Sequence, residues 1–144
     1  MKVSTKGRYA LRMMLDLAEH RNDGFVALKD VARRQDISKK YLEQIVTVLN
    51  RSDFLQTNRG SQGGYRLAKP PNRYTLGSIL RLTEGSIAPV PCLDHGPASC
   101  VRSDFCTAVG VWKGLEKVIA NYLDGITLQD ILDISVEKGN EYSI

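Results

Sequence analysis

The sequence predicts a mainly α-helical fold with a small β-hairpin, and three stretches carry that prediction. Residues 38–49 place apolar side chains at the i, i+3, i+4, i+7 spacing of a helix that packs on a core. Two short runs typical of strands, 54–58 and 65–67, enclose a loop that contains three glycines. Residues 103–124 repeat apolar side chains at alternating steps of three and four. Together these stretches indicate a winged helix-turn-helix domain followed by a long C-terminal dimerisation helix.

Length and composition are those of a globular protein. The chain has 144 residues, 42% of them hydrophobic, so it can bury a core without disulfides or structural metals. The start, MKVSTKGRY, lacks the apolar region of a signal peptide, and no apolar run reaches membrane-spanning length. The three cysteines, an odd number, argue against a disulfide framework and favour a reducing compartment. We therefore expect a cytoplasmic protein with no membrane partner.

The charge is distributed unevenly along the chain. Residues 1–75 hold fifteen Lys and Arg against seven Asp and Glu, whereas residues 76–144 hold five against nine. The net charge of +4 therefore combines a basic half with an acidic half. This asymmetry favours a nucleic-acid-binding domain over residues 1–75, joined to a second region over residues 76–144.

The basic half begins with two predicted helices. The first runs from Ser4 or Thr5 to Arg21, and turn residues 22–24 follow it. Residues 25–27 are compatible with a short strand, and a short helix follows with Lys29, Arg33 and Arg34 facing outward. Residues 35–37 then form a tight connection to the next helix, as in helix-turn-helix proteins. The residues expected to face inward are Leu11, Met14, Leu15, Ala18, Leu28, Val31 and Ala32.

The helix over residues 38–49 has two chemically different faces. Ser38 is placed to cap its N-terminus, and Leu42, Ile45, Val46 and Leu49 form the apolar stripe. The opposite face carries Lys40, Glu43, Gln44 and Thr47, with Lys39 at its edge. Such a mixed, donor-rich face can contact phosphates and read base edges in a major groove, although an ordinary solvated face has the same composition.

The loop 59–64 has the composition of a DNA-contacting wing. Three glycines allow the backbone to approach a partner closely, at an entropic cost that a purely structural turn rarely needs. Arg59 at its base can follow a phosphate backbone or enter a minor groove. The loop matches neither nucleotide-binding glycine pattern. With the charge asymmetry, the helix pair and this loop favour DNA binding.

The acidic half is expected to form the dimer. Residues 70–72 end the first domain, Thr75 caps a short helix with Leu76, Ile79 and Leu80 inward, and residues 85–101 form a loop. The long helix is expected to start at Ser103 as N-cap and to end at Gly125 as C-cap. Its seam favours a symmetric partner, which suits a palindromic operator with half-sites about 34–36 Å apart. The seam residues are Phe105, Ala108, Trp112, Leu115, Ile119 and Tyr122.

A capping box opens the last predicted helix. Thr127 and Asp130 have the spacing of this motif, in which each side chain accepts a hydrogen bond from the other residue's N–H. The helix is expected to be short, and the polar tail from Val136 is expected to fray.

Cys92, Cys100 and Cys106 form a candidate metal site. Seven and five residues separate them, in a loop rich in Pro, Gly, Asp and Ser rather than on an apolar face. Cys106 is expected in the first turn of the long helix, where the helix dipole favours thiolate. A fourth ligand is needed, with His95, Asp94, Asp104 or a partner-subunit residue as candidates. The spacing favours an iron–sulfur cluster, and zinc or unmetallated thiols remain alternatives.

The chain resembles the IscR-type winged-helix regulators over almost its whole length. The motifs STKGRYALRMMLDLA, ISKKYLEQIV, RGSQGGYRL, the cysteine loop and GITLQDI occur in the same order. The resemblance implies a homodimer that binds DNA and couples its affinity to a cluster held by the three cysteines. It also implies that Lys40, Glu43 and Gln44 face bases, and that the wing faces the backbone or minor groove. The DNA-binding candidates are Ser38, Lys39, Lys40, Tyr41, Glu43, Gln44, Thr47, Arg59, Gly60, Ser61, Gln62, Gly63 and Gly64.

The expected function is therefore transcriptional control, by a repressor of iron–sulfur cluster biogenesis or iron homeostasis genes. The cluster-biogenesis branch of this family is similar but has a histidine where this chain has Val109. The predicted DNA-reading helix nevertheless looks most like that branch. The resemblance therefore favours [2Fe-2S] over [4Fe-4S]. A cluster-free repressor that senses thiol redox state or a partner enzyme, for example in cysteine metabolism, is the alternative. The sequence contains no Ser/His/Asp set, no motif of paired catalytic carboxylates and no phosphate loop. We therefore do not expect an enzyme.

Overall fold

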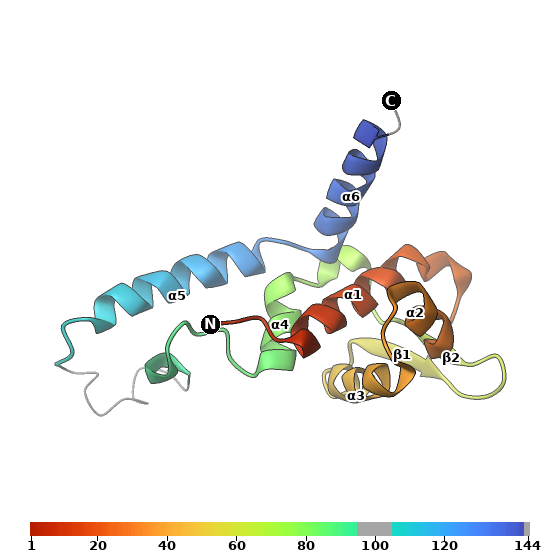
Figure 1. Cartoon of the computed structure of the whole chain (residues 1–144), viewed down its shortest axis with the longest axis horizontal. Helices are drawn as coiled ribbons and strands as arrows, with labels where there is room; N and C mark the ends of the chain where they lie inside the picture. Colours follow the sequence, from red (N-terminus) through yellow and green to blue (C-terminus); the bar gives the residue numbers. More distant parts are fainter. Residues whose placement is uncertain (95–104, 143–144) are drawn as a thin grey trace.

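The helices and strands of a computed structural model confirm the predicted fold class. The structure describes residues 1–94 and 105–142, which form six α-helices and one antiparallel hairpin (Figure 1). The elements are α1 (Thr5–Glu19), α2 (Leu28–Gln35), α3 (Lys39–Asn50), β1 (Leu55–Asn58), β2 (Gly64–Leu67), α4 (Leu76–Glu84), α5 (Val109–Asp124) and α6 (Leu128–Tyr142).

Helix α1 is the centre of the core. Ser4 caps it by accepting a hydrogen bond from the Gly7 N–H at 3.1 Å. The predicted inward face is correct for Met14 and Ala18, which are buried, but Leu11 and Leu15 are only half-buried. Other elements pack on several sides of α1, so its buried surface includes residues that the apolar periodicity did not predict. These are Ala10, Met13 and Leu17.

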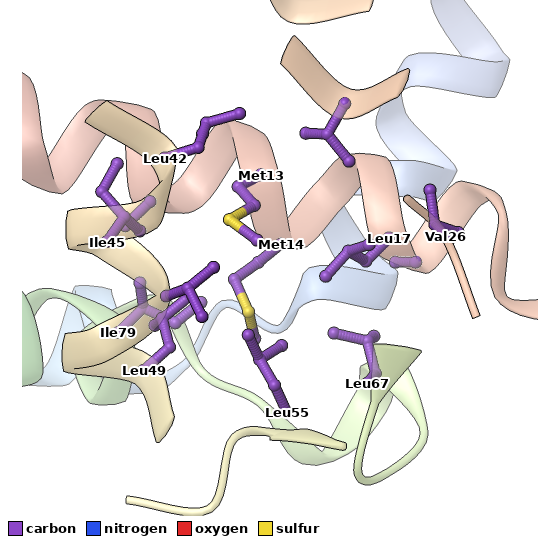
Figure 2. Packing of buried hydrophobic residues seen from close by; sticks show 14 of the residues in the cluster. Met13, Met14, Leu17, Val26, Leu42, Ile45, Leu49, Leu55, Leu67 and Ile79 are labelled. Atoms are coloured by element: carbon purple, nitrogen blue, oxygen red, sulfur yellow. The ribbon is translucent and has the colours of Figure 1, made fainter. Parts of the chain in front are cut away.

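The core joins residues from both predicted regions of the chain. Figure 2 shows Met13 and Met14 of α1 between Leu42 and Ile45 of α3, Leu55 and Leu67 of the hairpin, and Ile79 of α4. Leu128 and Leu132 of α6 belong to the same cluster. The division at residue 75 stays a prediction, and the apolar packing is continuous across it.

Helix α5 extends away from the body, and its C-terminal part packs against α4 (Figure 1). Leu123 packs there with Leu80 and with Ile87 of the loop after α4. Arg81 forms a bidentate pair with the Asp124 carboxylate, at 2.6 and 2.9 Å. A Cβ atom at Gly77 would overlap this carboxylate, so glycine leaves room for the Asp124 side chain against α4.

The predicted start of this long helix at Ser103 is wrong. Residues 105–108 form turns and α5 begins at Val109, so the first two seam residues, Phe105 and Ala108, precede the helix. Val109 and Gly110 open the helix with low helix propensity, and Ala108 gives no side-chain cap. Ser103 itself lies outside the described residues. The C-cap at Gly125 is confirmed.

Helix α6 is longer than predicted. The capping box is present, because the Thr127 N–H donates to Asp130 at 2.9 Å and the Asp130 N–H donates to Thr127 at 3.1 Å. The expected frayed tail from Val136 instead continues the helix to Tyr142. Its backbone bonds are satisfied within the helix, although residues 133–139 are exposed.

Candidate nucleic-acid interface

Helices α2 and α3 form the predicted helix-turn-helix. Asp36 in the turn adopts a left-handed conformation, with φ of 53°, and Ile37 is buried beneath the turn. Aspartate tolerates this conformation better than most residues, which explains how the turn closes without glycine. Ser38 caps α3 as predicted, accepting from the Tyr41 N–H at 3.1 Å.

The predicted two faces of α3 are confirmed. Its apolar stripe is buried, as is Val48, while Lys39, Lys40, Glu43 and Gln44 are exposed. Thr47 is exposed too, and its hydroxyl donates to the Glu43 carbonyl at 3.0 Å, which leaves the oxygen available to accept from a partner. Their contacts to DNA stay a prediction.

Tyr41, also among the DNA-binding candidates, has a packing role in addition. Its ring is half-buried and meets the Tyr9 ring edge-on, with centroids 5.6 Å apart. The contact fixes the start of α3 against α1. A role toward DNA is therefore restricted to the part of Tyr41 that remains accessible.

A buried ionic network, which the sequence reasoning missed, holds the turn against α1. Asp16 is 1% exposed and accepts hydrogen bonds from Arg34 at 2.7 and 3.0 Å and from Gln35 at 3.0 Å. Arg12 in turn donates to the Gln35 side chain and backbone carbonyl. The signal for it was a carboxylate between apolar residues of α1, with Arg and Gln at the end of the next helix.

This network keeps Asp16 ionised. Burial by itself raises the pKa of Asp16, but the hydrogen bonds from Arg34 and Gln35, with the charges of Arg34 and His20, lower it overall below the ordinary 3.8. The His20 ring lies 3.7 Å from the carboxylate. A charged Asp16 thus fixes the end of α2 and the turn that precedes α3.

The hairpin forms the predicted wing. Leu55 pairs with Leu67 and Asn58 with Gly64 across β1 and β2. The expected strand at residues 25–27 is a single bridge, in which Val26 and Tyr65 exchange two hydrogen bonds of 2.8 Å. Arg66 stacks on the Phe25 ring at 4.3 Å and donates to Gln56 at 2.8 Å. These contacts attach the base of the wing to the segment before α2.

The wing glycines have an internal explanation that the sequence did not reveal. A Cβ at Gly64 would overlap the Val26 carbonyl, and a Cβ at Gly63 would overlap the Asn58 carbonyl. Gly60 instead has φ of 115° and open space around it. Gly63 is thus needed for packing within the hairpin and Gly64 for its contact with Val26, and only Gly60 of the three leaves the backbone open to a partner. Arg59, Ser61 and Gln62 are exposed beside it.

The structure describes part of the predicted cysteine site. Cys92 is exposed in a short 3₁₀ turn, Pro91–Leu93, which the buried Leu93 anchors to the body. Cys106 is half-buried and lies three residues before α5, so the predicted place in the first helical turn is wrong. Its carbonyl accepts from the Val109 N–H at 3.3 Å. Cys100 lies outside the described residues.

The ligand candidates differ in their surroundings. Asp94 is exposed and accepts a hydrogen bond from the Ser86 hydroxyl at 3.0 Å, while His95 and Asp104 lie outside the described residues. No group of three ligand-type side chains comes together within 1–94 and 105–139. The donor chemistry nevertheless fits a cluster, because Cys92 is exposed, Cys106 is half-buried, and thiolate is the ligand that iron–sulfur clusters take.

The polar α3 face beside a basic wing defines the class of the protein: a winged helix-turn-helix DNA-binding protein. A family model described as Rrf2, iron-dependent transcriptional regulator, matches residues 3–134. The chain belongs to the Rrf2 family of transcriptional regulators. The resemblance to IscR-type regulators is confirmed, as is the expectation of a regulator rather than an enzyme.

Named relatives support this assignment. The transcriptional regulator IscR of Aliivibrio salmonicida is 36% identical over 132 residues, which cover 92% of this chain and 77% of the relative. The structure of IscR from T. potens has a TM-score of 0.74 and 38% identity, covering 94% of this chain and 88% of that one. CymR, the global cysteine regulator of B. subtilis, has a TM-score of 0.78 and 33% identity, covering 93% and 98%.

Within residues 1–94 and 105–142, each helix is too short or too polar to span a membrane.

Proposed function

We propose that this regulator is a homodimer that represses genes of iron–sulfur cluster biogenesis or iron homeostasis, under the control of an iron–sulfur cluster. The observation that carries the proposal is the exposed polar face of α3 beside the wing, in a chain similar to IscR over 92% of its length. Lys40, Glu43 and Gln44 contact base edges in the major groove. Arg59 contacts the backbone or enters the adjacent minor groove.

The apolar surface of α5 supports dimerisation. Val118 and Tyr122 are each 66% exposed, and Trp112 and Leu115 are about 40% exposed in the single chain. Trp112, Leu115 and Tyr122 belong to the predicted seam, and Val118 lies beside it on the helix. A second copy of α5 would cover them and would place two α3 helices on a palindromic operator.

Cys92, Cys100 and Cys106 would hold the cluster, with [2Fe-2S] favoured over [4Fe-4S] and the fourth ligand among His95, Asp94 and Asp104. A bound cluster would supply a charge that changes with its redox state. The residues of this chain would transmit the change. Ile87, in the loop that leads to Cys92, packs on Leu123 at the base of α5. A shift of this loop would therefore alter how α5 leaves the body, and with it the distance between the two α3 helices.

Such a response is a population shift between dimers that fit the operator and dimers that do not. It requires the cluster site to differ in free energy between the two arrangements. The contact between Ile87 of the loop and Leu123 of α5 supports a physical connection between the cysteine loop and the dimerisation helix.

The test combines composition with DNA selection. The full chain is purified without oxygen, its visible spectrum, iron and acid-labile sulfide are measured, and its preferred duplex is selected from a random pool. We expect a coloured protein with iron and sulfide that selects a palindrome. A protein that selects no sequence would contradict sequence-specific DNA binding. A coloured protein that lacks sulfide would contradict the presence of an iron–sulfur cluster.

A second candidate function is cluster-free repression that responds to thiol redox state or to a partner enzyme. The likeness to CymR, named as a cysteine regulator, favours it, since that structure covers 93% of this chain. A colourless anaerobic preparation without iron, which still selects a palindrome, would establish this candidate in place of the first.

A further inference from the structure

A cation-lined cleft lies between the wing, the start of α2 and both ends of α3, where Lys39 and Asn50 line it. Its volume is about 570 Å³, and Lys29, Lys39 and Arg59 reach it from these three elements. Thr57 and Asn58 of β1 contribute polar side chains. The cleft is thus built from segments far apart in the sequence, which the hairpin and the Val26–Tyr65 bridge bring together.

The charge of this cleft is unbalanced. No carboxylate lines it among the residues that the structure describes. Lys29, Lys39 and Arg59 are all exposed, and none forms an ion pair in the described part of the chain. By contrast, Arg33 is paired with Asp30 and Arg34 with Asp16 nearby. Three unpaired cations around one concavity focus a positive potential, which favours an anionic partner.

The position of the cleft selects the kind of anion. It touches the first and last residues of α3, Lys39 and Asn50, but Glu43, Gln44 and Thr47, the outward residues expected to face bases, do not line it. A duplex whose major groove receives α3 carries its sugar–phosphate backbone along the edge of the groove. The cleft lies where that backbone would pass between α3 and the wing.

We infer that this cleft seats a DNA backbone phosphate, and that Lys29 is a phosphate contact in addition to α3 and the wing. The inference rests on the proposed DNA-binding function and adds to it a residue from α2. Lys29 contributes affinity without sequence preference and fixes the register of the duplex between the helix pair and the wing.

The first test is the salt dependence of binding, with Lys29→Ala compared with Lys138→Ala. Both variants remove one exposed charge per subunit, and Lys138 lies on α6, away from the cleft. The duplex is the one that the wild-type chain selects. Each lost phosphate contact lowers the slope of log Kd against log salt by about 0.9, so a dimer of Lys29→Ala loses about 1.8. The affinity ratio of wild type to this variant then falls about tenfold between 50 and 200 mM salt.

The second test locates the phosphate. Single phosphates of the duplex are replaced by neutral methylphosphonates, and Kd is measured for wild type, Lys29→Ala and Lys29→Arg. We expect one position in each half-site whose neutralisation weakens wild type and Lys29→Arg but not Lys29→Ala. Thermal unfolding by circular dichroism should be the same for all variants.

The outcomes separate this inference from the proposed function. If Lys29→Ala keeps the salt slope of Lys138→Ala while wild type selects and binds its duplex, the cleft inference is overturned and DNA binding stands. A Lys29→Ala variant that remains sensitive to every methylphosphonate also overturns it. If wild type binds no duplex, the proposed function fails and the inference fails with it.

Discussion

Asp16 shows how a single buried charge can organise a surface that it does not reach. Its carboxylate is 1% exposed, yet it binds Arg34 and Gln35 at the end of α2, directly before the turn that leads into α3. Removing one member of a buried pair leaves the other without its partner. The orientation of α3 on the body therefore depends on a residue that cannot touch DNA.

The Asp16→Asn substitution tests whether the buried carboxylate stabilises the fold. We expect the free energy of unfolding at pH 7 to fall by about 2–3 kcal/mol, less than for a fully enclosed pair because Arg34 is 29% exposed. Asp30→Asn, which removes the exposed pair with Arg33, should cost about 0.5 kcal/mol or less. Urea denaturation measures both. Equal effects of the two substitutions would contradict the structural role of Asp16.

The same pair predicts a pH dependence. The pKa of Asp16 is lower in the folded chain than the ordinary 3.8, so its stabilising contribution is fully present above that value and is lost as pH falls through the folded pKa. The difference in stability between wild type and Asp16→Asn should therefore shrink below about pH 4. A difference that stays constant down to about pH 3 would contradict the lowered pKa.

Glu43 should act by exclusion at the reading surface. Its exposed carboxylate can accept from cytosine N4 but repels phosphates and the acceptor edge of guanine. We expect Glu43→Ala to broaden the set of selected sequences by relaxing one position by about 1–3 kcal/mol. Glu19→Ala, which removes an exposed carboxylate at the end of α1, is the control and should leave the selected sequences unchanged. Identical selections for both variants would remove this role from Glu43.

At the scale of elements, the parts with local signals were predictable. The predicted caps at Ser38, Thr75 and Thr127 form, because a cap needs only the residues of one helical turn. The start of α5 was not predictable, because the seam spacing continues by chance through Phe105 and Ala108, which lie outside the helix. The buried faces of α1 also needed knowledge of its neighbours, which periodicity along one helix does not contain.

The wing depends on glycine for its packing against the segment before α2. A Cβ at Gly64 would overlap the Val26 carbonyl and disturb the bridge between Val26 and Tyr65. Gly64→Ala should therefore lower the free energy of unfolding by about 1–3 kcal/mol, with loss of amide protection at Tyr65. Ser61→Ala in the exposed tip should stay within about 0.5 kcal/mol of wild type. Full amide protection at Tyr65 in Gly64→Ala would contradict this explanation of the glycine.

At the scale of the molecule, the arm formed by α5 is joined firmly to the DNA-reading body. Thr75 and Thr127 form a bridge at the start of α4 and α6, and the Leu76 N–H donates to the Ile126 carbonyl at 2.8 Å. Arg81 and Asp124 fix the end of α5, and their pairing lowers the pKa of Asp124. These contacts join residues about fifty positions apart, so no local pattern in the sequence could have predicted the direction of the arm.

A charge on the apolar face of α5 should separate the proposed dimer. Val118→Glu introduces a carboxylate at a position that is 66% exposed in the single chain, so the fold of the subunit should be retained. At about 100° per residue, Lys113 lies on the opposite side of the helix. Lys113→Gln changes the net charge by the same amount and should stay dimeric. Analytical ultracentrifugation measures the mass, and a dimeric Val118→Glu variant would contradict the assignment of this face.

The most direct test of the central claim is the operator affinity of wild type and of the Cys92→Ala, Cys100→Ala, Cys106→Ala triple variant, measured without oxygen before and after cluster removal with a chelator. We expect the wild-type Kd to change at least tenfold on removal. The triple variant should be colourless, with one Kd in both conditions. A wild-type Kd that is unaffected by removal, or a triple variant that keeps both colour and the wild-type response, would contradict cluster control of DNA binding.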